Sequence, residues 1–64
     1  KYLRASRLNG VRRDLKAARD ASVSVQDVAT RWGFDHLSQF SQDYKHLFGE
    51  LPSATLRLNL KRIK

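Results

Sequence analysis

The side chains of this 64-residue sequence that could do chemistry gather between residues 35 and 46. Asp35, His36 and Ser38 are the residue types of a hydrolytic relay, but neighbours one and two apart on a helix do not face each other. His36 and His46 could bind a metal, but a helix would separate them by roughly 15 Å, and the sequence offers no Cys or third His. We therefore expect no enzyme, metal site or cofactor.

Polar side chains share one face of the helix expected here, and this arrangement suits hydrogen bonding to nucleic acid bases. At about 100° per residue, five of them fall on this face: Asp35, Ser38, Gln39, Gln42 and His46. Gln can pair bidentately with adenine, and Ser or His can bond to bases more permissively. An ordinary solvated helix looks the same, so the face predicts base recognition only within a suitable fold.

Two amphipathic patterns position this face and meet at a Gly-Phe turn. The first pattern begins at Ser24, whose hydroxyl can accept a hydrogen bond from a first-turn amide. Val28, Ala29 and Trp32 then share one helical face. Gly33 is the residue type that most readily ends a helix in a left-handed conformation. The spacing predicts a short helix that stops at the turn.

The second pattern predicts a helix over residues 35–48, with Asp35 as its N-cap and Gly49 as its stop. Its apolar face comprises five residues that we expect to lie in the core: Leu37, Phe40, Tyr44, Leu47 and Phe48. Together the two patterns predict a helix-turn-helix over residues 24–49, with the second helix in the position that enters a DNA major groove.

A long helix precedes this unit, from Tyr2 to about Asp20. Its apolar seam is expected to consist of Leu8, Val11, Leu15 and Ala18. Gly10 lies inside, at a cost of about 1 kcal/mol relative to Ala. Either the helix is locally weak there or another backbone comes close.

A short helix over residues 52–60 is expected to follow, with Pro52 in its first turn and Ala54, Leu56 and Leu58 as its apolar contacts. Residues 61–64 form a basic tail that can fray. The expected fold is all-α: a helix over 1–21, the helix-turn-helix over 24–49 and the C-terminal helix, in a homeodomain-like helical bundle. The sequence contains no Met and begins at Lys1, so we expect 1–64 to be one partial domain of a longer protein.

Charge is distributed unevenly along the sequence, whose net charge is +7. Residues 1–20 carry +5, residues 21–56 carry −2 and residues 57–64 carry +4. Any attraction to phosphate must therefore come mainly from the flanking segments. The same segments favour an alternative function, a basic helical module that binds an acidic protein partner or an anionic surface. No apolar run approaches a membrane span and no signal peptide opens the chain, so we expect a soluble cytoplasmic protein with no membrane partner.

A longer pattern runs through residues 25–57: A-x-x-W-G-F, then S-x-F-S-x-x-Y-K-x-x-F-G-x-x-P, then Arg57. This pattern resembles the second helix-turn-helix of the AraC/XylS transcription regulators. The basic helix before it, in which Tyr2-Leu3-Arg4 leads into Arg7-Leu8, resembles the linker helix that joins the family's two units. The sequence departs from the family at Leu51, Gln42 and Asp43, where a capping Ser or Thr, a basic residue and a small or apolar residue are usual.

The resemblance implies a bacterial DNA-binding domain whose two helix-turn-helix units enter successive major grooves of double-stranded DNA. Effector sensing or dimerisation usually belongs to a separate domain. On this hypothesis the helix over 35–48 reads the bases. Its expected base contacts are Asp35, His36, Ser38, Gln39 and Gln42, and the expected backbone contacts are Arg31, Lys45 and Arg57.

Overall fold

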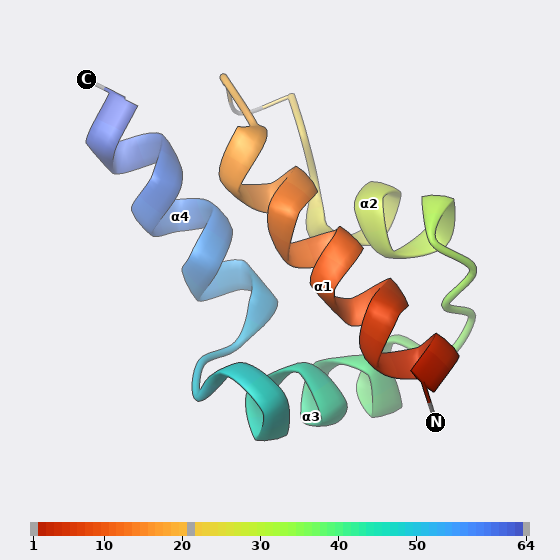
Figure 1. The fold of residues 1–64 in the computed structure, drawn as a ribbon. Helices are drawn as coiled ribbons and strands as arrows, with labels where there is room; N and C mark the ends of the chain where they lie inside the picture. Colours follow the sequence, from red (N-terminus) through yellow and green to blue (C-terminus); the bar gives the residue numbers. More distant parts are fainter. Residues whose placement is uncertain (1, 21, 64) are drawn as a thin grey trace.

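The computed structural model describes residues 2–20 and 22–63, and all the regular structure in these ranges is helical. The helices are α1 (Tyr2–Ala17), α2 (Val25–Arg31), α3 (Leu37–Phe48) and α4 (Pro52–Ile63). Figure 1 shows α1 and α4 running side by side, with α3 across their lower ends and α2 on the other side of α1. The all-α prediction is confirmed.

The core is built around α1, which packs against both α2 and α4. Its predicted seam is buried, with Val11 and Leu15 completely inaccessible to solvent. Val28 and Ala29 of α2 meet this seam in the same cluster. Each fully buried Val or Leu side chain stabilises the fold by about 1.5–3 kcal/mol. The stability of α1 therefore depends on the burial of its seam.

An aromatic column fixes α3 to the core. The ring centroids of Phe34 and Phe40 lie 4.9 Å apart, those of Phe40 and Tyr44 6.0 Å, and those of Tyr44 and Phe48 4.6 Å. The Tyr44 hydroxyl donates a hydrogen bond of 2.8 Å to Thr55 Oγ1, and Thr55 donates in turn to Glu50. Burial raises the pKa of Tyr44, and its hydroxyl is satisfied inside the core.

Local capping follows the sequence prediction at three positions. Ser24 Oγ accepts a 3.0 Å hydrogen bond from the amide of Asp27. Gly33 and Gly49 adopt φ values of 86° and 79°, in the left-handed region where a Cβ would be strained. These residues therefore set the start of α2, the turn between α2 and α3, and the end of α3.

The predicted helix bounds were wrong at two other ends. α1 stops at Ala17 rather than near Asp20, because Asp20 Oδ1 accepts a 2.9 Å bond from the amide of Ser22 and forms a turn. α3 begins at Leu37, and its N-cap is His36 rather than Asp35. The chain remains extended through His36 because Phe34 has first to reach the core.

At the C-terminal end, α4 continues to Ile63, so the predicted boundary at residue 60 and the separate tail from 61 were wrong for residues 61–63. The Asn59 amide donates to the carbonyls of Leu15 and Ala18 at 3.1 and 2.8 Å, which holds α4 against the end of α1. Residues 1, 21 and 64, at the edges of the predicted ranges, lie outside the described residues.

Three leucines expected to make core contacts are exposed instead. Leu37 is 36% exposed, Leu47 48% and Leu58 52%. Leu47 lies at the edge of the contact between α1 and α3, beside Ala5 and Leu8, where no further helix of the described chain covers it. On α4, Thr55 takes the buried position, since its hydroxyl completes the hydrogen bond to Tyr44.

Gly10 has a different role from the two expected, because the group that approaches it is a side chain. A Cβ on Gly10 would lie 2.5 Å from Cη2 of Trp32. The indole is held in place by a 2.8 Å hydrogen bond from its Nε1 to Asp14 Oδ2. The glycine therefore makes room for the ring that packs α2 on α1.

We expect Gly10→Ala to destabilise the fold, although Ala favours a helix more than Gly. Overpacking against Trp32 should cost about 1–3 kcal/mol, more than the gain of about 1 kcal/mol in helix propensity. Thermal unfolding followed by circular dichroism should show a lower Tm. Ser6→Ala, at an exposed position of the same helix, is the control. A Tm that rises equally in both variants would contradict this account.

Candidate nucleic-acid interface

The side chains predicted to recognise bases lie on the outward face of α3 and in the segment just before it. All five are exposed: Asp35, His36, Ser38, Gln39 and Gln42. The inward face of the same helix buries Phe40 and Tyr44 completely. Because the aromatic column fixes the inward face, the rotation of α3 about its axis is set, and the polar face points to solvent.

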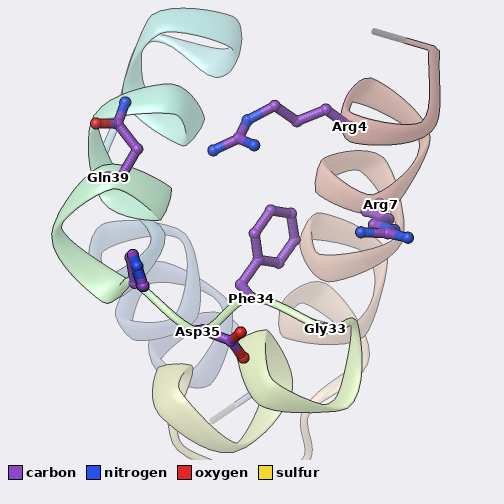
Figure 2. Close-up of a pocket in the computed structure, with 7 residues that line it drawn as sticks. Arg4, Arg7, Gly33, Phe34, Asp35 and Gln39 are labelled. Carbon is purple, nitrogen blue, oxygen red and sulfur yellow. The ribbon is translucent and has the colours of Figure 1, made fainter.

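A depression forms where the N-terminal half of α3 faces α1. Its lining residues are Arg4, Arg7, Gly33, Phe34, Asp35, His36 and Gln39. Figure 2 shows Arg4 extending from α1 across the opening towards α3, above the Phe34 ring. The Arg4 guanidinium carbon lies 5.9 Å from the centroid of that ring, within the range of a cation–π contact. Three predicted base contacts thus share one concave surface with two arginines.

Hydrogen bonds connect Arg4 to the polar face of α3 through Asp43. Arg4 Nε donates to Asp43 Oδ2 at 2.7 Å, and Gln39 Nε2 donates to Asp43 Oδ1 at 3.1 Å. These bonds, that of Arg4 first, lower the pKa of Asp43. We call these three residues the Arg4–Asp43–Gln39 network. It connects one predicted base contact to α1.

Further along the same face, a second depression is lined by Gln42, Lys45 and His46. Lys45, a predicted backbone contact, is exposed beside the predicted base contact Gln42. A cation next to an exposed amide suits a helix in a groove, where bases and phosphates lie close together.

The other predicted backbone contacts lie on neighbouring helices. Arg31 of α2 is 64% exposed, and its Nη1 lies 3.5 Å from Asp14 Oδ2. An exposed pair at that distance contributes about 0–1 kcal/mol, so Arg31 can leave Asp14 for a phosphate at little cost. Arg57 is exposed on α4. The structure gathers Asp35, His36 and Gln39 in one depression but not all eight predicted residues.

Arg4 and Arg7 are the site residues that sequence reasoning did not identify. Both were counted in the basic N-terminal segment, but nothing in the local sequence says which of its cations face α3. A spacing of three residues places them on the same side of α1, and this was the available signal. Which side that is depends on how α1 packs.

A metal-binding cluster and a membrane-spanning helix are both absent from the part of the chain that the structure describes. Residues 2–20 and 22–63 contain no cluster of three His, Asp or Glu side chains that could hold a metal ion. None of the four helices described is both long and apolar enough to cross a membrane.

Comparison with known proteins identifies the domain type. A family described as a helix-turn-helix domain matches residues 1–58. A probable thc operon regulatory protein of Rhodococcus erythropolis is 42% identical over 57 residues, and the XylDLEGF operon transcriptional activator of Pseudomonas putida is 37% identical over 62 residues. The chain belongs to the AraC/XylS family of transcriptional regulators.

The AraC/XylS relatives are much longer than this chain. The matches cover 89% and 97% of the chain but only 17% and 19% of the two relatives. A further Pseudomonas putida protein, XylDLEGF operon transcriptional activator 2, is 41% identical over 58 residues, which is 37% of its length. No solved structure matches the chain with comparable significance. The similarity therefore concerns the helix-turn-helix region of an AraC-type regulator, a DNA-binding module of a family of regulators rather than enzymes.

We expect the carboxyl group of Asp43 to titrate with a pKa below the usual range of an aspartate, because Arg4 stabilises its ionised form. Because folding lowers the pKa of Asp43, the network stabilises the fold at pH values above the pKa of Asp43 in the unfolded chain. This stabilisation is lost as the pH falls through the pKa of Asp43 in the folded chain. An NMR titration of the Asp43 carboxyl carbon measures this directly. Arg4→Ala should raise the midpoint and Arg7→Ala should leave it unchanged; equal effects would contradict the assignment.

Proposed function

We propose that this chain binds double-stranded DNA in a sequence-specific manner, with α3 in the major groove. The observation that carries the proposal is the fixed, exposed polar face of α3, whose opposite side is locked into the core by Phe40 and Tyr44. A helix held by its buried face can present the same side chains to every base step it meets. Residues 37–48 therefore replace the range 35–48 as the reading helix.

The proposed base contacts retain the chemistry expected from the sequence. Gln39 and Gln42 can each pair with adenine through the amide oxygen and an amide N–H. Ser38 and His36 can donate or accept at several base edges, and Asp35 can accept a hydrogen bond from the amino group of cytosine. All five lie at or just before the N-terminal half of α3, the part of a recognition helix that meets base edges.

The proposed phosphate contacts lie on different helices. Lys45, Arg31 and Arg57 are exposed on α3, α2 and α4. Arg7 joins them, because it is exposed on α1 and lines the depression beside His36 and Gln39. Cations on several helices can bind the phosphate backbones that border a major groove.

The whole protein's activity is also a proposal, since the chain spans about a fifth of the first relatives it matches. We propose that it is part of a bacterial transcriptional regulator without enzymatic activity that acts in the cytoplasm, where its DNA is. Effector binding and any dimerisation would belong to regions beyond the matched segment. The domain division into linker helix and helix-turn-helix unit is part of this proposal.

The alternative, a basic module for an acidic partner, is less well supported by the packing of α1. Arg12 lies 5.1 Å from the Phe48 ring centroid, and Arg13 lies 5.9 Å from that of Trp32. Both arginines therefore make contacts within the fold, and Arg12 is partly buried, whereas Arg13 stays exposed. Lys16 remains an exposed cation of that segment.

We expect Gln39→Ala and Gln42→Ala each to cost about 1–3 kcal/mol on the best DNA site and to relax base preference at one position. The loss follows from removing one amide pair with a base. Selection of the wild-type chain and each variant against a randomised duplex library, followed by fluorescence anisotropy on the selected sites, measures both effects. Weakening that is equal on all sequences would exclude base reading by these residues.

We expect Lys45→Ala to weaken binding on all sequences alike and to reduce the slope of log K against log salt by about one unit. One phosphate contact would be lost, and one fewer counterion would be released. Lys16→Ala is the matched control, since Lys16 lies in the depression between α1 and α4 with Asn59 and Arg62. A slope that falls with Lys16→Ala and not with Lys45→Ala would instead favour the basic interaction module.

A further inference from the structure

We propose that Asp43 is a positioning residue for base recognition, which holds the Gln39 amide in its reading orientation and is itself held by Arg4 of the linker helix. The inference rests on the proposed function, in which α3 reads bases. It concerns an acidic residue on the helix that we propose enters the groove.

The geometry joins three side chains from two helices. Gln39 and Asp43 are four residues apart on α3, the spacing at which helical side chains meet, and their bond measures 3.1 Å. Arg4 lies 39 residues away in sequence and donates to the other carboxylate oxygen at 2.7 Å. Each oxygen of Asp43 therefore has its own donor, and the carboxylate cannot rotate without losing one.

Arg4 is restrained on its own side as well. Its guanidinium lies over the Phe34 ring at 5.9 Å from the centroid, and Phe34 is buried in the core. The planar guanidinium donates a directional hydrogen bond to Asp43 while it keeps a cation–π contact with the ring, and its fixed donor geometry differs from that of a Lys ammonium. A shift of α1 would therefore move Arg4 and, through the two hydrogen bonds, the side chains of Asp43 and Gln39.

The network leaves Gln39 able to read a base. A Gln amide has two N–H donors and one oxygen acceptor. Asp43 uses one donor, so the second donor and Oε1 remain for the bidentate pair with adenine. Because a free Gln side chain loses substantial rotamer entropy when it is ordered, a residue that orders it before binding reduces that cost.

The network also makes a carboxylate acceptable close to DNA. A lone aspartate on the reading helix would repel the phosphates on both sides of the groove. Arg4 carries the opposite charge within hydrogen-bond distance, so the pair presents no net charge. This explains how a chain with Asp at this position can retain a DNA-reading helix.

The test compares Asp43→Ala with Asp43→Asn and Gln39→Ala in library selection. We expect Asp43→Ala to reduce base discrimination by about three- to tenfold at the position that Gln39→Ala affects and nowhere else. It should have no further effect when Gln39 has already been replaced by Ala. The Asp43→Asn variant keeps a side-chain carbonyl oxygen that can accept from Gln39, so it should recover part of the discrimination. Asp27→Ala removes an exposed acid from α2 and is the charge-matched control.

A second measurement needs no DNA. In an NMR relaxation experiment on the free chain, the Gln39 side-chain amide should be more ordered than that of Gln42. The order should be lost in Asp43→Ala and kept in Arg7→Ala. Circular dichroism confirms that each variant remains helical. If Gln39 is as mobile as Gln42 in the wild-type chain, the positioning role is wrong whatever the binding data show.

The outcomes separate the inference from the function on which it rests. If Gln39→Ala changes base preference at one position and Asp43→Ala acts equally on all sequences, as Asp27→Ala does, the positioning role is overturned and base reading stands. If neither Gln39→Ala nor Gln42→Ala changes base preference, base reading by α3 fails, and the role of Asp43 fails with it.

Discussion

Burial of the α1 seam holds together a chain that has no cysteine to form a disulfide, because α1 packs more extensively against α2 and α4 than α3 does. Val11 and Leu15 are fully buried in it. A domain of this size buries little apolar surface. Each contact of α1 therefore contributes a larger share of the stability of the fold than it would in a larger protein. Gly10 belongs to the same constraint, since it lets the Trp32 ring approach and bring α2 against the helix.

The position of α3 follows from this arrangement. Phe34, Phe40 and Tyr44 bury one side of the helix-turn-helix in the cluster that α1 organises, and the remaining side of α3 must then face solvent. Base recognition requires side chains held within about half an ångström of their working geometry. A short helix on a loop could not supply this, whereas one fixed by an aromatic column can.

Residues of α1 extend to the exposed side of α3 as well as to the core. Arg4 bonds to Asp43, and Arg7 lines the depression beside the N-terminal half of α3. This surface therefore combines residues from distant parts of the region that matches AraC-type regulators. The side chain of Gln39 is connected to α1 through two hydrogen bonds, both accepted by Asp43.

The sequence by itself determined the helical class, the turn and the polar face of α3, because these depend on neighbours within about four residues. Ser24 and Gly33 act through their own backbone positions. Tertiary structure alone decided how far α4 extends and which arginines reach α3. These features depend on contacts such as Arg4 with Asp43 and Asn59 with Ala18, 39 and 41 residues apart. No local pattern encodes such pairings, since they arise only when the hydrophobic seam brings distant helices together.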